Sequence, residues 1–343
     1  MGVKIFDLLP KKNIELKDLA GKIVLLDASL VMYQFLSTIR QRDGTPLKDS
    51  SGNITSHLVG IFSRSTKLMQ YGIKIAFVFD GKSPELKKKE QKRRAELKAQ
   101  ATIKYEKAVQ EKDVENMAKF AKRTSRLTSE MVVEAKELIE ALGLPIIQAP
   151  SEAEAQASYM VAKGDGYAVG TQDADSFMFG AAKVIKNLTI SGKRRKPGKV
   201  AYVTVKPELI ELGAALNEMG IDREQLIALG MLIGTDFNIG GIKGIGPKNG
   251  LKLVKKFGKD FDALFEEVKW SEFFDTEWTE VYYTIKKMPV TDDYTLEWKD
   301  VSKDKLFEIL REKHDFSEER ILSTVEKLQK NKNKQQHSLN KWF

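Results

Sequence analysis

Three short apolar segments of the chain each run into an aspartate, and this pattern restricts the fold more than any other feature of the sequence. They cover residues 22–27, 73–80 and, less clearly, 167–173. Their length, their β-branched residues and the Gly and Pro residues near them favour strands over helices. Segments with helical periodicity occupy residues 55–70, 130–142 and 152–163. This alternation predicts an α/β fold with a mostly parallel sheet covered by helices, and ligands bind such sheets outside the carboxyl ends of the strands.

The composition excludes several kinds of site. The chain has no cysteine, so disulfides, thiolate catalysis and cysteine-based zinc sites are ruled out. Its three histidines, at 57, 314 and 337, are too scattered in sequence to suggest a histidine-based metal site. No run of 18 apolar residues is present, and the N-terminus lacks the pattern of a signal peptide. We therefore expect an intracellular protein that makes no use of a membrane.

The positive charge is concentrated in one segment. The net charge is +9, and residues 82–126 hold 15 Lys and Arg against 7 Asp and Glu. A basic balance of this size suggests a polyanionic partner such as a nucleic acid. Residues 83–126 are rich in helix formers and poor in apolar residues, so we expect exposed helices that stand off the body. The alternative is an ordinary solvated helix stabilised by pairs of opposite charge.

Acidic residues near strand ends, helix starts and Gly-flanked loops predict a metal site. The seven candidates are Asp27, Asp80, Glu152, Glu154, Asp173, Asp175 and Asp236. Magnesium prefers oxygen ligands, and two ions about 3.5–4 Å apart can clamp a phosphodiester and activate water for in-line attack. Taken singly, each acid also has a structural interpretation as a turn or cap residue; Ser151 and Glu154, for example, match a capping box. The set as a whole favours the metal site.

A glycine-rich segment at 240–250 precedes a periodic helix at 251–257 and predicts a phosphate-binding turn. Gly244 and Gly246 allow a tight turn whose backbone N–H groups face outward. Charge would be added by Lys243, Lys248 and Lys252. The alternative is a plain connector between helices. No P-loop pattern occurs in this segment.

Two further groups of basic residues fit contacts to a nucleic-acid backbone. Lys87, Arg94 and Lys98 have the spacing i, i+7 and i+11, which places them on one face of a helix. If that face looks toward the acids, it can hold the scissile phosphate. Lys193 and Arg194 belong to a basic stretch, 193–196, that reads as a loop tip and a second backbone contact.

The C-terminal residues have the pattern of a docking peptide. Residues 328–338 form a polar stretch that we expect to be a linker without a core face. At its end stand a glutamine, an aliphatic residue and two aromatic residues: Gln336, Leu339, Trp342 and Phe343. Such a segment can become ordered on a partner. The alternative is a tail that folds back on its own domain.

Together these motifs resemble one family. The chain is similar, essentially from Gly2 to Phe343, to the flap endonucleases of the xeroderma pigmentosum G nuclease family, of the archaeal, clamp-binding type. The motifs are Leu26-Asp27-Ala-Ser-Leu-Val-Met-Tyr33-Gln-Phe, Val78-Phe-Asp80-Gly, Ala149-Pro-Ser-Glu152-Ala-Glu154-Ala, Gln172-Asp173-Ala-Asp175-Ser, Gly234-Thr-Asp236-Phe and Gly241-Ile-Lys-Gly-Ile-Gly. They are long, they occur in the family's order, and they are jointly diagnostic.

The resemblance implies a fold and a division of the chain. It implies a PIN-like α/β nuclease fold with a mostly parallel central sheet flanked by helices, a helical arch insertion and a helix–hairpin–helix DNA-binding element. A single nuclease domain would cover 1–330, followed by a flexible tail at 331–343. Its parts would be 1–82, the arch at 83–126, 127–235, the helix–hairpin–helix element at 236–260 and a helical part at 261–330.

The resemblance also implies an activity and its residues. The family cuts phosphodiester bonds at single-/double-strand junctions and removes 5′ flaps in replication and repair, with the seven acids holding two Mg²⁺ ions, for which Mn²⁺ would substitute. Lys87 and Arg94 match the basic pair of the gateway helix, Tyr33 matches a residue that stacks on a base, and Gly2 matches a glycine near the active site. The family's duplex-binding element, which also holds K⁺, matches Gly234, Asp236, Lys243, Gly244, Gly246 and Lys248. The tail residues match a peptide that binds the sliding clamp, and a monomer on the clamp trimer is implied.

The chain also departs from the family pattern. It stops at Phe343 without the basic extension of eukaryotic members, which favours a cytoplasmic, archaeal-type protein over a nuclear one. The final pair is Trp-Phe rather than Phe-Phe, and Ser83 stands where many members have proline. Two other functions remain open: a non-catalytic DNA-binding clamp adaptor on the same scaffold, and a nuclease for bubbles or four-way junctions. The complete acidic set argues against the adaptor.

Overall fold

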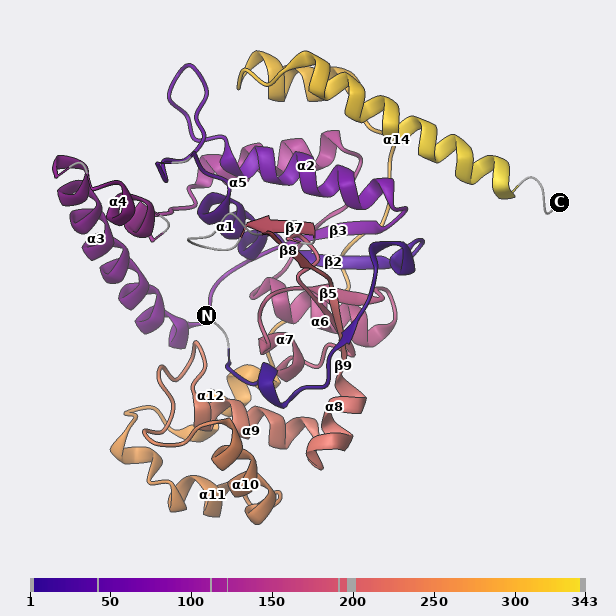
Figure 1. Cartoon of the computed structure of the whole chain (residues 1–343). Coiled ribbons are helices and arrows are strands. Elements are labelled where there is room, and N and C mark those ends of the chain that lie inside the picture. Colours follow the sequence, from indigo (N-terminus) through magenta and orange to yellow (C-terminus); the bar gives the residue numbers. More distant parts are fainter. Residues whose placement is uncertain are drawn as a thin grey trace.

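A computed structural model describes residues 3–41, 43–111, 113–121, 123–190, 192–195 and 202–339. Its centre is a seven-stranded sheet with the order β1-β9-β6-β5-β2-β3-β4 (Figure 1). The strands are β1 (Lys12–Asn13), β2 (Ile23–Asp27), β3 (Lys74–Phe79), β4 (Ile146–Gln148), β5 (Ala168–Gly170), β6 (Lys183–Lys186) and β9 (Glu208–Glu211). Each pair of neighbouring strands from β6 to β4 is parallel, whereas the pairs β6–β9 and β9–β1 are antiparallel. The predicted mostly parallel sheet is confirmed.

The central strands bury both of their faces. In β2, Leu25 belongs to one hydrophobic core, whereas Val24 and Leu26 belong to the other, because successive side chains of a strand point to opposite faces. The register pairs Asp27 with Val78, so the last residue of β2 lies beside the end of β3. Parallel pairing therefore brings the acid-bearing loops that follow these strands to one edge of the sheet.

Helices cover the two faces as predicted (Figure 1). One core is completed by α1 (Ala28–Thr38), α2 (Ser56–Gln70), α5 (Ser129–Ala141), α13 (Lys303–Leu306) and the π-helical turn Phe307–Glu312. The other core is completed by α6 (Ala153–Lys163), α7 (Asp175–Met178), α8 (Leu212–Met219) and α9 (Arg223–Ile233). The periodic segments predicted at 55–70, 130–142 and 152–163 correspond to α2, α5 and α6. Among the residues that the structure describes, no helix is long and apolar enough to cross a membrane.

A helical lobe made of α10 (Pro247–Phe257), α11 (Phe261–Glu267) and α12 (Trp278–Lys286) extends the second core. It lies at the bottom of Figure 1. Aromatic rings hold it together: Phe265 stacks on Trp278 with ring centroids 4.8 Å apart and meets Trp270 edge-on at 5.2 Å. The lobe presents the glycine-rich turn at the start of α10.

The basic insertion stands apart from both cores, as predicted. After a short 3₁₀ turn (Glu85–Lys87), α3 (Lys88–Gln110) and α4 (Val114–Ala121) pack against each other at the left of Figure 1. Within the 23 residues of α3, only Glu90, Ala101 and Ala108 are buried. Such a segment is anchored to the body mainly at its ends, and here it is called the arch.

Two predictions about local structure are wrong. The stretch expected to be a linker, 328–338, continues helix α14 (Glu318–Leu339), because Ile321, Val325 and Leu328 share a buried face and the following Lys and Gln residues are good helix formers. Asn331 also donates a hydrogen bond to the carbonyl of Gln70 (3.1 Å).

The other wrong prediction is the loop tip at 193–196, of which 193–195 lie in strand β7 (Gly192–Arg195), paired with β8 (Tyr202–Val205) in a separate hairpin. Backbone pairing across a hairpin does not need apolar side chains, so a run of basic residues can form a strand.

The structure says nothing further about several of the predicted site residues. Gly2, Lys196, Trp342 and Phe343 lie outside the described residues, and the side chains of Lys193, Arg194, Gln336 and Leu339 are not described either.

Candidate active site

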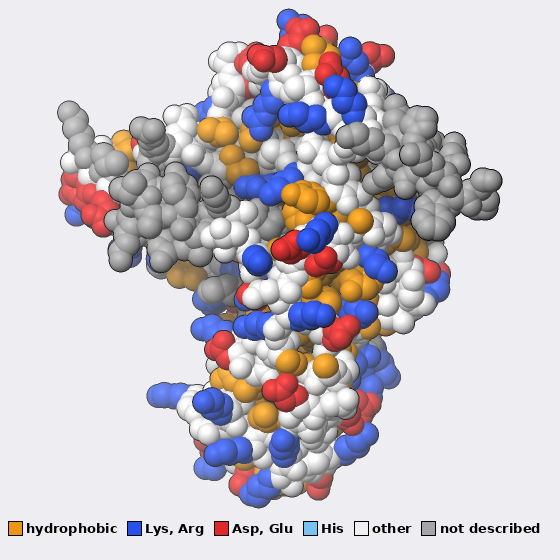
Figure 2. Space-filling view, turned by 45° about the vertical axis from the view of Figure 1, so that its right-hand side comes forward, with side chains coloured by type: hydrophobic (Ala, Val, Ile, Leu, Met, Phe, Trp, Pro, Cys, Tyr) orange, Lys and Arg blue, Asp and Glu red, His pale blue; other side chains and the backbone are white. Residues whose placement is uncertain are grey.

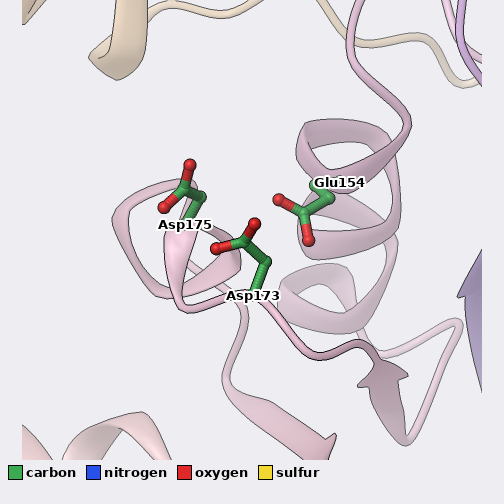
Figure 3. A group of neighbouring side chains, drawn as sticks. All are labelled: Glu154, Asp173 and Asp175. Carbon is green, nitrogen blue, oxygen red and sulfur yellow. The ribbon is translucent and has the colours of Figure 1, made fainter. Parts of the chain in front are cut away.

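Three of the predicted acids converge beyond the end of β5. Glu154 comes from the first turn of α6, Asp173 from the loop after β5, and Asp175 from the start of α7 (Figure 3). One carboxylate oxygen from each lies within 4.8 Å of the others. Three hard oxygen donors at this spacing fit a divalent cation such as Mg²⁺.

Neighbouring groups fix the orientation of these carboxylates. Glu154 accepts a hydrogen bond from the Thr171 hydroxyl (2.7 Å), and Asp175 accepts one from the backbone N–H of Val3 (2.7 Å). The capping-box alternative for Glu154 is wrong, since Ser151 instead donates its hydroxyl to the carbonyl of Lys82 (3.0 Å). The Glu154 side chain therefore does not cap α6, and it points toward the other acids.

Asp27 and Asp80 each accept a backbone N–H at the start of a helix and also belong to the acidic group. Asp27 accepts the N–H of Leu30 (2.8 Å) at the start of α1, and Asp80 accepts the N–H of Ala153 (2.8 Å) at the start of α6. The structural and functional interpretations of these residues are thus compatible. Each cap bond uses one oxygen and leaves the other available.

The loop that carries Asp80 is fastened to the loop that carries Glu152. The N–H of Gly81 donates to the carbonyl of Ser151 (2.6 Å), and a side chain at Gly81 would lie 2.2 Å from the Ala149 carbonyl oxygen. Only glycine permits this approach. The close contact sets the position of Asp80 relative to Glu152.

Burial makes this cluster costly in charged form. Burial raises the pKa of Asp27, Glu154 and Asp175 well above the usual carboxyl range, and the charges of neighbouring acids raise it further. Asp27 is affected by Asp80, Glu154 by Asp173, and Asp175 by Asp173 as well. Burial also raises the pKa of Glu152, although the nearby Lys87 opposes this effect. A cluster of this kind requires cations to become fully ionised.

Two basic residues at the base of the arch provide part of that compensation. Lys87 forms an ion pair with Glu152 and lies 3.5 Å from Asp236. Arg94 Nη2 lies 2.5 Å from Asp236 Oδ1. Burial acts to lower the pKa of Lys87, but the charge and hydrogen bond of Glu152, together with the charges of Asp236 and Asp80, outweigh it and raise that pKa. The structure therefore brings Lys87 and Arg94 to the acids, as their helical spacing predicted.

Lys98 does not share that position. Its Nζ lies 4.6 Å from the ring centroid of Tyr33 and 3.4 Å from the Tyr33 hydroxyl. Tyr33 is 38% exposed, which leaves its ring accessible. The predicted common face of Lys87, Arg94 and Lys98 is thus divided between the acids and an exposed aromatic ring.

Glu90 is a charged residue at this site that the sequence pattern did not single out. It is buried on the first turn of α3 and lies between Arg93 and Arg94. The hydrogen bond from Arg93 lowers the pKa of Glu90 to about 2, against the effect of burial. Its spacing to these arginines, i+3 and i+4, is visible in the sequence, but its burial is not.

The glycine-rich turn has the predicted form. Gly244 adopts a positive φ of 86°, and a β-carbon added to Gly244 or to Gly246 would meet no other atom within 4 Å, so both glycines face open space. Gly234 and Gly241, by contrast, pack backbone to backbone, because a side chain on Gly234 would lie 2.6 Å from the N atom of Gly241. Gly246 is the N-cap of α10. The lysines at 243, 248 and 252 are exposed around the turn.

Comparisons with known proteins agree with this arrangement. Residues 1–101 match the XPG N-terminal domain, and residues 143–236 match the XPG I-region. A flap endonuclease 1 of Pyrococcus abyssi is 49% identical, covering 100% of this chain and 98% of that protein. One of Hyperthermus butylicus is 49% identical, covering 96% and 95%.

Solved structures match over the same length. Flap endonuclease-1 from Methanococcus jannaschii superposes with a TM-score of 0.75 at 39% identity, covering 96% of this chain and 98% of that one. The catalytic core of Rad2 in complex with DNA substrate has a TM-score of 0.69 at 25% identity, covering 96% and 100%. The acidic cluster, the arch and these matches along the whole chain agree, and the chain belongs to the XPG family of nucleases.

Proposed function

We propose that the chain is a metal-dependent structure-specific nuclease that cuts 5′ flaps at single-/double-strand DNA junctions, with 5′–3′ exonuclease activity, in DNA replication and base excision repair. The observation that carries the proposal is the acidic cluster at the carboxyl ends of β2, β3 and β5, faced by Lys87 and Arg94. Its full-length similarity to proteins named flap endonuclease 1 supports the substrate class. This substrate also assigns it to the interior of the cell, where the chromosome lies.

The seven acids would hold two Mg²⁺ ions, and Mn²⁺ would be accepted by the same oxygen donors. Bound divalent ions supply activation of a water molecule and stabilisation of charge on the phosphate. The chain's own contribution is to fix the ligands before the substrate arrives. Thr171 and the backbone of Val3 orient Glu154 and Asp175, while the fastened loops position Asp80. Preset ligands of this kind need little rearrangement during reaction.

Lys87 and Arg94 would then contact the scissile phosphate. In the protein alone they neutralise Glu152 and Asp236. With metal cations compensating those acids, Lys87 and the Nη2 group of Arg94 would be free to donate hydrogen bonds to phosphate oxygens at the same place. Arginine and lysine so placed stabilise charge that develops in the transition state. Tyr33, exposed beside the base of the arch, would stack on a base next to the cut.

The duplex would lie against the helical lobe. The turn formed by Gly244 and Gly246, with Gly234 and Asp236 preceding it, would bind backbone phosphate together with Lys243 and Lys248, and K⁺ would be held at this turn. Figure 2 shows Lys and Arg side chains spread over the surface of this lobe at the bottom of the view. Lys193 and Arg194 of the β7–β8 hairpin would make a second backbone contact. These contacts carry no sequence information, as expected for an enzyme that recognises structure.

The C-terminal residues would attach the enzyme to a sliding clamp. Gln336, Leu339, Trp342 and Phe343 have the spacing of a docking peptide that orders on its partner. We expect a monomer that occupies one subunit of the clamp ring. Deleting residues 336–343 should leave cutting by the isolated enzyme unchanged and abolish stimulation by the clamp. Unchanged stimulation would refute the assignment of the tail.

Cleavage of a 5′-labelled double-flap DNA with Mg²⁺ tests the main proposal. Wild type should cut at the junction, whereas Asp173→Ala should bind the same DNA and leave it intact. Asp293→Ala, which removes an exposed aspartate elsewhere, serves as the matched control and should cut normally. Binding without cutting by wild type, across Mg²⁺ and Mn²⁺, would instead identify a non-catalytic DNA-binding adaptor.

A further inference from the structure

Glu90 is a buried carboxylate that is not one of the seven acids. It is only 3% exposed although it lies on the arch, whose other buried residues in α3 are alanines. Acidic side chains are rarely buried to this degree unless they are paired. The side chains that bind Glu90 therefore explain how a buried carboxylate is tolerated at this position.

Two consecutive arginines bind this carboxylate. Arg93 donates two hydrogen bonds to it, from Nε (2.6 Å) and Nη2 (2.7 Å). Arg94 donates one, from Nε to Oε1 (2.6 Å). Paired guanidinium and carboxylate groups of this kind have well-defined geometry. Two positive charges and one negative charge leave a net charge of +1, which Arg94 carries toward the acids.

Arg94 bridges two carboxylates with different surroundings. Its Nε is bound to Glu90, while its Nη2 lies 2.5 Å from Asp236. A bond to Asp236 alone would be lost whenever a cation occupied that carboxylate. The bond to Glu90 lies outside the cluster and would remain. Because an arginine side chain has many rotamers, a second fixed contact is needed to keep its guanidinium in one orientation.

The ionisation of Glu90 agrees with a permanent contact. The hydrogen bond from Arg93 outweighs burial and lowers the pKa of Glu90 to about 2. The carboxylate therefore stays charged across the neutral range. The hydrogen bond from Arg93 is the largest cause of the lowered pKa, and Arg94 contributes to it as well.

We infer that Glu90 is a positioning residue that holds Arg94 in the orientation from which it contacts the scissile phosphate. This inference rests on the proposed function, because it acts through the role given to Arg94. Glu90 itself touches neither the acidic cluster nor the substrate. Its removal should slow cutting without weakening the binding of DNA.

Single-turnover cleavage of the double-flap DNA, with affinity measured separately in Ca²⁺, tests the inference. Glu90→Gln should cut about tenfold more slowly, with affinity changed by less than about twofold, since the loss concerns orientation in the transition state. Glu90→Asp keeps the charge and should recover most of the rate. Glu85→Gln is the matched control: Glu85 is an exposed acid on the preceding turn, paired with Lys88, and its removal should change nothing.

A double-mutant cycle distinguishes positioning from a general effect on the fold. Arg94→Ala should lose more activity than Glu90→Gln, and combining the two should cost no more than Arg94→Ala alone, because Glu90 acts through Arg94. Additive losses, or a normal rate in Glu90→Gln while Arg94→Ala is slow, would overturn the inference. A normal rate in Arg94→Ala would instead overturn the proposed role of Arg94.

Side-chain NMR provides a test that does not depend on activity. In wild type labelled at arginine, the Nε–H group of Arg94 should be as ordered as the backbone, because Glu90 accepts its hydrogen bond. In Glu90→Gln this order should fall. A mobile Arg94 Nε–H in wild type would contradict the inference directly.

Discussion

The acidic cluster and a second group of ionisable side chains are built in opposite ways. The acidic cluster gathers like charges, with Lys87 and Arg94 at its edge. The second cluster, here called the histidine cluster, consists of Asp49, His57, Glu134 and His314. There, acidic and basic side chains alternate. His314 lies 2.9 Å from Asp49 through Nδ1 and 3.5 Å from Glu134 through Nε2, and His57 lies 3.3 Å from Glu134.

The difference separates a site kept for a ligand from one that joins separate segments of the fold. Like charges in a buried group repel and are poorly solvated, so the acidic cluster weakens the fold until cations arrive. The histidine cluster instead places histidines beside carboxylates, and it joins the loop before α2 to α5 and to the segment after the π-helical turn. Within the described residues, both ring nitrogens of His57 are buried without a hydrogen-bond partner. We therefore expect changes in the acidic cluster to affect activity and changes in the histidine cluster to affect stability.

The largest effect is expected for Lys87→Ala. Removing this cation takes away a contact to the phosphate, and the single-turnover rate should fall by about 10²–10³-fold, the usual result of losing one such donor. Thermal unfolding should change little. Lys88→Ala, which alters an exposed neighbour, is the control. A rate within threefold of wild type would show that Lys87 takes no part in catalysis and that the activity depends on the acids.

The next largest effect is expected for His314→Ala. Both ring nitrogens of His314 contact buried or half-buried carboxylates, so its loss leaves Asp49 only the hydrogen bonds that Asn53 donates. The free energy of unfolding should fall by about 2 kcal/mol, measured in denaturant. Activity per folded molecule should remain. The exposed neighbour Lys313 offers a control in Lys313→Ala. A stable but inactive His314→Ala would contradict the division between the two clusters.

A smaller effect of opposite sign is expected for Glu154→Gln. Burial and Asp173 raise the pKa of Glu154 above the usual 4.5, so its stabilising protonated form is present at low pH and is lost as the pH rises through the raised value. In metal-free protein at neutral pH, glutamine should raise the stability by on the order of 1 kcal/mol. The gain should vanish below pH 4.5.

Adding Mg²⁺ should reverse the order of stability of wild type and Glu154→Gln, because the ion stabilises the wild type through a ligand that the variant lacks.

Asp49 should behave in the opposite way to Glu154. Burial acts to raise the pKa of Asp49, but the hydrogen bonds from His314 and Asn53 together outweigh it, and that pKa lies below its usual value. Its stabilisation is thus present at neutral pH and lost as the pH falls. A Glu154→Gln variant less stable than metal-free wild type would show that repulsion does not dominate the acidic cluster.

The sequence was sufficient to predict the structural features that depend on short-range residue patterns. The strands that end at Asp27 and Asp80 were recognisable because their apolar runs are short and uninterrupted. The bond from Val3 to Asp175 was not predictable, because it joins residues 172 positions apart. The burial of Glu90 was missed for a related reason: helical spacing gives its partners but not the packing of the arch base. The end of α14 was misjudged because a run of polar residues with high helix propensity looks like a linker when no apolar residue interrupts it.

The smallest effect concerns the arch, which links the basic residues to the acidic cluster only at its base. Because α3 buries little beyond Glu90 and two alanines, its backbone hydrogen bonds are exposed to solvent. Amides between 90 and 120 should exchange rapidly in the free protein, while those of β2 and α6 stay protected. Flap DNA with Ca²⁺ should slow exchange in the arch, because the phosphates then pair with its Lys and Arg residues. Strong protection in the free protein would mean that the arch is rigid before DNA binds, and that Lys87 and Arg94 are held in place by the whole arch rather than by their local contacts at its base.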